Sequence, residues 1–429
     1  MSISTESLAA AAETLLASCL ANPKSPDGEA LETLLVAIAS RDGEVATAAA
    51  RLFIGRVVEG LSDRFEPALV DCYVDLFSQA VARCHPLWSS DYLTQRYQQL
   101  SQGHSPASAL PVDEVFVLSR ITLGADIAIT SVFLDAVSKR YPQARVWLVG
   151  SAKNHELFSG RVRHWPFDYP RGGTLRERIQ CVDELVGLGE EPGAVLIDPD
   201  SRISQLGLLP LLPSDRTLFF ESRAADPDSP RSLSDIASSF CFLRLAVPDA
   251  RPFLALPESL REEARHDREA LTAAPVTISL GVGGNPAKRL DTAFEASLLR
   301  TIAETGRPLW IDAGAGGAEA EWVRAAIDQA GLAQGQVQVL DGSFAKFCAY
   351  IAESAFYVGY DSAGQHAAAA LGIPGFTFFR GFVNERMMQR WTPRGPQQSV
   401  FPLSSETSPQ DALHALASAL QRLANPHNA

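Results

Sequence analysis

Residues 355–374, AFYVGYDSAGQHAAAALGIP, predict a strand, a polar turn and a helix in direct succession. The apolar residues 356–358 (FYV) are typical of a buried strand. Asp361 and Ser362 begin a polar elbow, and the alanine-rich run behind it favours a helix, which residues 372–374 (GIP) end. In an open parallel sheet this elbow lies at the carboxyl end of its strand, where the free N–H groups of the helix start suit a phosphate or diphosphate. The alternative is that Asp361 and Ser362 only cap the helix, as in many α/β proteins.

The same alternation of strands and helices recurs along most of the chain and indicates an α/β fold. The 429 residues, 46% of them hydrophobic and 20% charged, are enough for two or three domains with separate cores. The alternating pattern starts twice, so we expect two Rossmann-like, doubly wound domains that face each other across a cleft. The expected strands are Glu114–Ser119, Arg145–Gly150, Ala194–Ile197 and Thr217–Phe220, then Val276–Leu280, Pro308–Asp312, Val337–Leu340, Ala355–Tyr360 and Gly375–Phe379.

The N-terminal part of the chain differs, because its apolar residues recur at helical spacing with little strand signal. We therefore predict an additional N-terminal all-helical region over residues 1–107, which packs on the rest of the chain or forms a homo-oligomer contact. The two α/β domains are predicted at 108–256 and 276–405, with a helical connector at 257–275. Residues 406–429 are predicted to form a C-terminal helix, which in such architectures commonly crosses back to the first domain.

Composition excludes several classes of partner. The formal net charge of −13 disfavours nucleic acid and anionic membrane surfaces. No apolar run reaches the roughly 18 residues that a membrane span needs, and the N-terminus lacks the basic segment of a signal peptide. The six cysteines are spaced singly, which is typical of a reducing compartment. These features predict a cytoplasmic protein.

Three further segments carry residues suited to binding or catalysis. Residues 119–131, SRITLGADIAITS, follow the first expected strand. Residues 281–290, GVGGNPAKRL, combine glycines that allow close backbone approach with the positive charges of Lys288 and Arg289. Residues 312–321, DAGAGGAEAE, form a similar loop. A tight turn with a solvated lysine remains an alternative for residues 281–290.

Together these motifs resemble the heptosyltransferases, glycosyltransferase family 9, over roughly residues 115–395. The elbow matches best, with Asp361 and Ser362, then His366 five places after the aspartate, an alanine-rich helix and a Leu-Gly-x-Pro sequence at 371–374. The resemblance implies two Rossmann-like domains in the arrangement called GT-B. It also implies an inverting transfer of a sugar that needs neither a metal ion nor a cofactor.

The resemblance also assigns roles in the first domain. Asp126 takes the place of the family's catalytic aspartate, the general base that accepts a proton from the attacking hydroxyl. Thr130 falls in register behind it, and we expect Thr130 and Arg202 on the acceptor side. Ala125 is inserted between Gly124 and Asp126. The alternative for Asp126 is that it merely charges the first turn of a helix.

The second domain is expected to bind the donor, whose departing diphosphate needs fixed hydrogen-bond donors and cations. The resemblance places Lys288 on the phosphate, and a carboxylate of the loop at 312–321, Glu319 or Glu321, is expected to hold a ribose. Glu319 could equally be a first-turn helix acid, and His366 could equally be a packed core histidine. Ala363 stands where the family usually has glycine. The expected donor-binding residues are Gly283, Lys288, Arg289, Glu319, Asp361, Ser362, Ala363, Gly364 and His366.

The sequence therefore predicts a glycosyltransferase that moves a sugar, for example heptose from an ADP-linked donor, to a hydroxyl of a glycan, lipid-linked or protein acceptor. Asp198-Pro199-Asp200 has the D-x-D form that chelates metal ions in other glycosyltransferases, but it lies far along the chain from the donor loops. We expect no metal site there. The alternatives are a nucleotide-sugar epimerase or hydrolase of the same architecture, and a non-catalytic nucleotide-sugar-binding scaffold protein.

Overall fold

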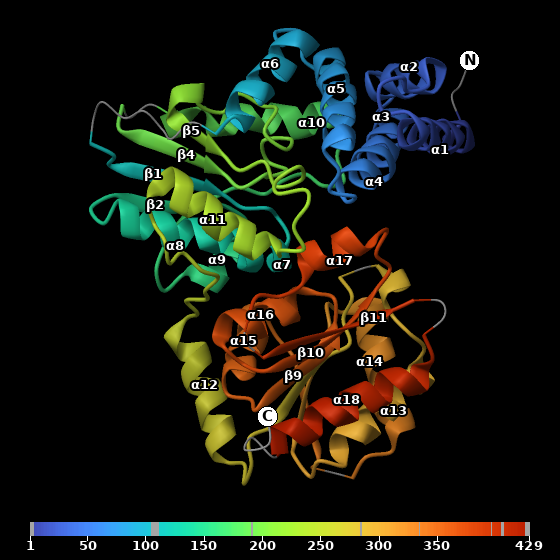
Figure 1. Cartoon of the computed structure of the whole chain (residues 1–429), viewed down its shortest axis with the longest axis vertical. Coiled ribbons are helices and arrows are strands. Elements are labelled where there is room, and N and C mark those ends of the chain that lie inside the picture. Colours follow the sequence, from blue (N-terminus) through green and yellow to red (C-terminus); the bar gives the residue numbers. More distant parts are fainter. Residues whose placement is uncertain are drawn as a thin grey trace.

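The computed structural model describes residues 4–103, 111–189, 192–283, 285–333, 335–395, 397–404 and 407–424. The prediction of two doubly wound α/β domains, here called the first and second lobes, is confirmed (Figure 1). The domain boundaries predicted at 107/108 and 405/406 lie outside the described residues. Within the part of the chain that the structure describes, none of the helices combines the length and apolar character of a membrane span.

Residues 4–103 form helices and turns that lie beside the first lobe (Figure 1). Polar side chains start several of these helices: Ser4, Asp27, Asp42 and Ser89 each accept a hydrogen bond from a backbone N–H of the first turn. The apolar faces of the helices share one core with a face of the first sheet. The elements are α1 (Thr5–Ala21), α2 (Gly28–Ile38), α3 (Gly43–Leu52), the π-helix η1 (Phe53–Val58), α4 (Glu59–Ser62), α5 (Pro67–Cys84) and α6 (Ser90–Ser101).

The first lobe has five parallel strands in the order β3-β2-β1-β4-β5. The four expected strands are present, but β3 was not predicted, because it is short, starts with charged residues and ends in proline. The strands are β1 (Glu114–Leu118), β2 (Arg145–Gly150), β3 (Arg163–Pro166), β4 (Ala194–Asp198) and β5 (Thr217–Phe219). The helices are α7 (Leu123–Ala125), the π-helix η2 (Asp126–Thr130), α8 (Ser131–Arg140), α9 (Ala152–His155), η3 (Glu156–Phe158), α10 (Leu175–Gln180), η4 (Cys181–Gly189), η5 (Ser214–Arg216) and α11 (Leu233–Leu245).

The second lobe has six parallel strands in the order β11-β10-β9-β6-β7-β8. All five expected strands are present, and β11 is an edge strand that was not predicted. The strands are β6 (Val276–Ser279), β7 (Leu309–Asp312), β8 (Val337–Leu340), β9 (Phe356–Tyr360), β10 (Gly375–Arg380) and β11 (Gln398–Leu403). The helices are η6 (Pro286–Lys288), α13 (Thr292–Ala303), α14 (Gly317–Ala330), α15 (Phe344–Ala352), α16 (Ala363–Leu371) and α17 (Glu385–Trp391), and the connector helix α12 (Glu258–Glu269) precedes them.

The C-terminal helix α18 (Pro409–Ala424) does not cross back to the first lobe, so that expectation was wrong. It packs against α13 and β11 of the second lobe (Figure 1). Ala412, Leu416 and Leu420 are buried in the second-lobe core. The apolar face that the sequence pattern indicates therefore covers this lobe.

The helical region contacts both lobes through the turn between α4 and α5. The Asn384 side-chain amide donates to the Arg64 carbonyl oxygen (3.2 Å), and the Arg386 guanidinium donates to the Phe65 carbonyl oxygen (2.8 Å). Phe65 is buried with a positive φ of 56°, and Arg223 of the first lobe stacks on its ring. This turn therefore joins the helical region to the second lobe as well as to the first.

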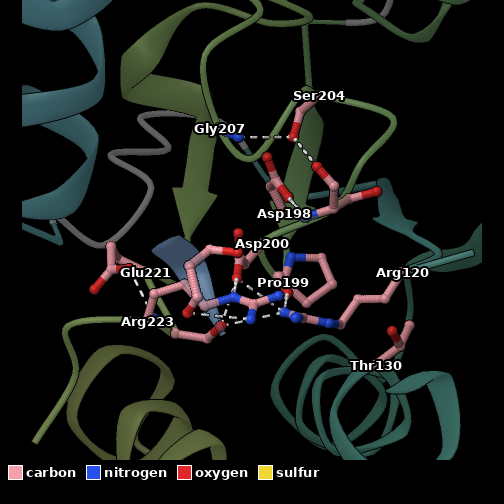
Figure 2. Close-up of polar contacts among 12 residues, drawn as sticks. Arg120, Thr130, Asp198, Pro199, Asp200, Ser204, Gly207, Glu221 and Arg223 are labelled. Carbon is pink, nitrogen blue, oxygen red and sulfur yellow. Dashed lines mark hydrogen bonds and ion pairs between the residues drawn. The ribbon is translucent and has the colours of Figure 1, made fainter. Parts of the chain in front are cut away.

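A buried ionic cluster ties the helical region to the loop that follows β1. Figure 2 shows the guanidinium groups of Arg120 and Arg223 converging on the carboxylate of Asp200. Nη1 of Arg120 lies 3.3 Å, and Nε of Arg223 3.0 Å, from the same Asp200 oxygen. Arg223 also pairs with Asp63 of the helical region (2.7 Å). Asp200 has a positive φ of 65°, a backbone conformation that Asp and Asn tolerate better than most residues.

Asp200→Asn should destabilise the fold by about 3–5 kcal/mol, since it leaves the buried Arg120 without its carboxylate and Arg223 with Asp63 alone. Asparagine also tolerates the positive φ, so the loss of stability reports the loss of the negative charge and not backbone strain. Urea unfolding followed by circular dichroism measures the loss. Glu32→Gln, which breaks an exposed pair with Arg83 (2.8 Å), is the control and should change the stability by less than about 1 kcal/mol. Equal losses in the two variants would refute the importance of the cluster.

The stability should also depend on pH through Glu221, which accepts hydrogen bonds from the backbone N–H groups of Arg223 and Ala224 (both 2.7 Å). Burial, assisted by the charge of Asp200, raises the pKa of Glu221 to about 7. The folded chain thus keeps a proton that the unfolded chain loses near pH ~4.3. The free energy of unfolding should therefore fall between about pH 4.3 and 7, with a contribution from Glu221 of at most about 1.4 kcal/mol per pH unit.

The measurement is urea unfolding over this pH range for the wild type and for Glu221→Gln. Burial also raises the pKa of Asp198, to about 6, which adds a slope of the same sign. The variant should therefore show a flatter profile without losing the pH dependence altogether. The same slope in both proteins would mean that the pKa of Glu221 is not raised.

Candidate functional site

A cavity of about 700 Å³ lies between the two lobes, and we call it the interlobe cavity. Its walls are loops and helix starts that follow strands of both sheets, which is where ligands of open α/β sheets bind. The first lobe contributes residues 121–125, Ser151, Lys153, Asn154, 167–169 and Arg171, and the helical region contributes Asp63. The second lobe contributes Val282, Gly283, Asn285, Lys288, 361–363, His366, Met387 and Trp391. A volume of this size suits a small organic ligand.

The second-lobe wall joins the glycine loop to the elbow. The Lys288 ammonium lies 2.6 Å from a carboxylate oxygen of Asp361 and also donates to the Asp361 carbonyl oxygen (3.2 Å). The other carboxylate oxygen of Asp361 accepts a hydrogen bond from the Gln365 amide (2.5 Å). The structure thus brings together Lys288 and Asp361, two of the expected donor-binding residues, in an ion pair that was not predicted.

The elbow presents the start of α16 to the cavity. Ser362 occupies the N-cap position, but its side chain accepts no capping hydrogen bond from the first-turn N–H groups, which are therefore available to a ligand. Ser362 and Ala363 line the cavity, as does Gly283 with a positive φ of 63°. These positions favour an anion, because the positive end of the helix dipole points toward them.

Gly364 does not line the cavity, contrary to its predicted place among the donor-binding residues. It packs against Tyr357 of β9, and a Cβ atom there would lie 2.2 Å from the tyrosine hydroxyl oxygen. The glycine is thus required by packing inside the lobe. Ala363 meets the first lobe: a Cβ atom on Gly124 would lie only 3.2 Å from its Cα. The two lobes therefore touch beside the cavity.

His366 borders the cavity but is almost fully buried, at 5% exposure. Burial, assisted by the charge of Lys288, lowers its pKa to about 3. Its ring lies edge-on to Trp391, 6.1 Å between centroids. A neutral imidazole in this position can donate or accept a hydrogen bond, but it cannot serve as a cation near neutral pH.

Two other predicted donor-binding residues form contacts within the second lobe. Arg289 is paired with the buried Glu295 through two hydrogen bonds and stacks on Trp322, 4.7 Å from the ring centroid. Glu319 accepts hydrogen bonds from the backbone N–H groups of Val282 (2.8 Å) and Ala315 (2.7 Å). Neither residue lines the interlobe cavity. Glu319 instead fixes two loops at the sheet edge relative to each other.

Asp126 and Thr130 are both completely buried, and neither lines the cavity. The Asp126 carboxylate accepts four hydrogen bonds, from the side chains of Ser119 (2.6 Å), Thr130 (2.7 Å) and Asn154 (2.5 Å) and from the backbone N–H of Arg120 (2.6 Å). Burial raises its pKa, while these hydrogen bonds act to lower it.

Asp126 starts the π-helix η2, whose wide turn accommodates one residue more than an α-helical turn. This is the position at which the sequence has the additional Ala125. The side chain that the resemblance assigns to the chemistry is therefore held inside the first lobe, where it organises the loop after β1.

Arg202 lines a neighbouring cavity of about 330 Å³, here called the second cavity, where it is paired with Glu59. Asp198 and Asp200 are both buried: Asp200 belongs to the ionic cluster, and Asp198 accepts a hydrogen bond from the backbone N–H of Ser201 (2.8 Å). Among the residues that the structure describes, no group of three or more His, Cys, Asp or Glu side chains lies close enough to hold a metal ion.

The sequence analysis missed several residues of the first-lobe wall. Lys153 and Asn154 lie in α9, while Asp168, Tyr169 and Arg171 follow β3. The segment after β3 was missed because β3 itself was not predicted. The polar run after the expected strand Arg145–Gly150 was the available signal for Lys153 and Asn154.

No protein-family model matches this sequence, and no curated protein matches it. Solved structures do match. The family 9 glycosyl transferase of Veillonella parvula has a TM-score of 0.54 at 15% identity, with 73% of this chain and 99% of that chain covered. ADP-heptose lps heptosyltransferase II of E. coli has a TM-score of 0.51 at 18% identity, with 72% and 99% covered. The E. coli heptosyltransferase WaaC with ADP has a TM-score of 0.52 at 16% identity, with 71% and 99% covered.

At sequence identities of 15–18%, the similarity between this chain and these structures concerns the fold. Two parallel sheets, a cavity between them and glycine-rich loops at the sheet edges are the features that the sequence predicted and that the structure contains. The chain therefore has the two-lobed fold of the heptosyltransferases of glycosyltransferase family 9, preceded by an N-terminal helical region.

Proposed function

We propose that this protein is an inverting glycosyltransferase that moves a sugar from a nucleoside diphosphate to an acceptor hydroxyl. The observation that carries the proposal is the second-lobe wall of the interlobe cavity, where Lys288, Asp361 and the uncapped start of α16 lie together. A cation and a row of N–H groups suit a diphosphate. Because one similar structure was solved with ADP and another is named for ADP-heptose, an ADP-linked heptose is the first donor to test.

The second lobe stabilises the leaving group in this mechanism. As the bond to the anomeric carbon breaks, negative charge grows on the diphosphate, and in this proposal Lys288 and the N–H groups at the start of α16, which line the cavity, stabilise that charge. Asp361 holds Lys288 in place and can accept a hydrogen bond from a sugar hydroxyl. His366 contacts the donor as a neutral group. The proposed reaction uses no metal ion, so turnover should resist a chelator.

The acceptor needs a carboxylate that can reach the cavity. Three carboxylates line it: Asp63, paired with Arg223; Asp361, paired with Lys288; and Asp168, which has no ion-pair or hydrogen-bond partner among the described residues. Asp168 also lies on the first-lobe side, opposite the proposed donor site. We propose Asp168 as the general base in this conformation. The assignment of Asp126 stays a prediction, and that carboxylate would first have to leave its four hydrogen bonds.

Nucleotide sugars and cell extract as acceptor source test the proposed function directly. A glycosyltransferase consumes donor and labels a component of the extract. Release of free sugar alone would indicate a hydrolase, and a changed sugar on an intact nucleotide would indicate an epimerase. Saturable binding without turnover would indicate a scaffold protein.

Lys288→Ala should weaken the binding of ADP by about 10- to 100-fold, because a charge-assisted hydrogen bond contributes about 1.5–3 kcal/mol. The affinity for adenosine should change much less. Isothermal titration calorimetry measures both ligands. Lys346→Ala is the matched control, since Lys346 is paired with Glu263 (3.0 Å) in the same lobe, outside the cavity. Equal losses for ADP and adenosine would contradict a phosphate contact.

Asp168→Asn should lower kcat by about 10²- to 10⁴-fold, the usual range for general base catalysis, with little change in Tm. Asp168 is exposed, so the substitution leaves the fold intact. Asp126→Asn, in contrast, should lower Tm, because an amide cannot accept all four of the hydrogen bonds that the Asp126 carboxylate accepts. Normal turnover in Asp168→Asn, together with lost turnover and an unchanged Tm in Asp126→Asn, would return the catalytic role to Asp126.

A further inference from the structure

The short helix α17 follows a strand of the second lobe, yet its side chains bond to the first lobe and to the helical region. Figure 1 shows it at the boundary between the two lobes. Arg386 and Arg390 lie one turn apart on this helix, and Arg394 follows shortly after its end. Arg386 bonds to the turn between α4 and α5, and Arg394 to the Ser238 hydroxyl (2.6 Å) and the Asp235 carboxylate (2.9 Å). These arginines thus form a row that faces away from the second lobe.

Arg390, in the middle of this row, is completely buried, at 1% exposure. Its guanidinium donates hydrogen bonds to four backbone carbonyl groups of one irregular segment of the first lobe, residues 225–231, between β5 and α11. The acceptors are the carbonyl oxygens of Ser229 (2.8 Å), Arg231 (2.7 Å), Ala225 (3.3 Å) and Asp226. Because the donor is charged, each of these bonds is stronger than a bond between neutral groups. Arg390 therefore fixes α17 to the first lobe.

The neighbouring face of α17 forms part of the interlobe cavity. Met387 and Trp391 each come directly after an arginine of the row, and both line the cavity. The carbonyl oxygen of Trp391 accepts a hydrogen bond from the Gln365 amide (3.4 Å), and its half-buried ring lies edge-on to His366. Adjacent faces of the helix thus do different things: one binds the first lobe, and the other presents apolar side chains to the cavity.

The ring of Trp391 lies within reach of a group attached to the proposed diphosphate. Its neighbour His366 belongs to the first turn of α16, where the N–H groups suit the diphosphate. An indole offers a large, flat and apolar surface. One face of a sugar ring presents C–H groups and matches such a surface. The cavity therefore combines a polar site for the diphosphate with an apolar wall beside it.

We propose that Trp391 contacts the sugar of the donor and that Arg390 is its positioning residue. Arg390 is not among the described residues that line the cavity, so it acts only through the place that it gives to α17. The first lobe thereby helps to shape the wall on which the sugar packs. The sugar contact rests on the proposed function, whereas the positioning of Trp391 by Arg390 does not.

Fluorine NMR of the full chain labelled with 5-fluorotryptophan tests the positioning without a ligand. The six tryptophans give six resonances, and the one that Trp391→Phe removes belongs to Trp391. Arg390→Met should shift or broaden this resonance, because α17 loses four hydrogen bonds to the first lobe. Arg390→Lys should largely restore it, since an ammonium group has three donors. Arg324→Met, the matched control on the exposed side of α14, should leave it unchanged.

ADP-heptose and ADP test the sugar contact in the same labelled protein. ADP-heptose should shift the Trp391 resonance more than ADP does. The resonance of Trp322, assigned with Trp322→Phe, should respond to neither ligand, because Trp322 stacks on Arg289 outside the cavity. In calorimetry, Trp391→Ala and Arg390→Met should each weaken the binding of ADP-heptose about tenfold and the binding of ADP much less.

An unchanged Trp391 resonance in Arg390→Met would overturn the positioning role. If this variant does not fold, Arg390→Gln, which keeps two donors, decides by the same resonance. Transfer of heptose without any response of Trp391 would overturn the sugar contact and leave the proposed function standing. If neither ADP nor ADP-heptose binds to the wild type, the proposed donor and the sugar contact both fail, and the unliganded spectra still establish or refute the role of Arg390.

Discussion

The arrangement of the site depends on one buried carboxylate that pairs with two guanidinium groups. Asp200 lies at the start of the loop after β4, Arg120 comes from the loop after β1, and Arg223 also pairs with Asp63 of the helical region. In a low-dielectric interior such a cluster is stable only when every charge keeps its partner. The loop that contains Ile121 and Thr122, which borders both cavities, is thereby fixed to the helical region and to the sheet at once.

The same arrangement gives the helical region a role beyond covering a sheet face. Its turn at residues 63–65 bonds to α17 of the second lobe through Asn384 and Arg386, while its helices share a core with the first lobe. Proteins of this kind of two-lobed architecture can change the angle between their lobes by hinge motion. A third element that contacts both lobes would restrict such motion.

Much of the fold could be predicted from the sequence, because most strands and helices show their own apolar period, whereas the edge strands β3 and β11 do not. Residues 355–374 gave a strand, an elbow and a helix in the correct order, but α16 starts at Ala363, within the polar run that precedes the alanines. Side-chain direction was harder. Gly364, Arg289 and Glu319 lie in the right loops but make contacts within the lobe. Spacing along the chain fixes the position of a residue on a loop, but it does not fix which way the side chain points.

Asp126 shows the same limit: its place in the chain was predicted, but the direction of its side chain was not. A motif match placed it after the first strand, which is correct, yet one additional residue and the π-helical turn of η2 turn its carboxylate into the interior. The second cavity could not be predicted from the sequence, for another reason. Its arginines come from positions 51, 171, 178 and 202, and only the packing of the helical region on the first lobe brings them together.

The close approach of Gly124 to Ala363 sets the spacing of the two halves of the molecule. Glycine at position 124 allows this close contact, because a Cβ atom there would lie only 3.2 Å from the Cα atom of Ala363 in the second lobe. A single methyl group at this seam would have to wedge the halves apart by a few tenths of an ångström. Position 124 therefore has room only for glycine unless the backbone at Ala363 shifts, which makes this contact between the lobes sensitive to a change of one carbon atom.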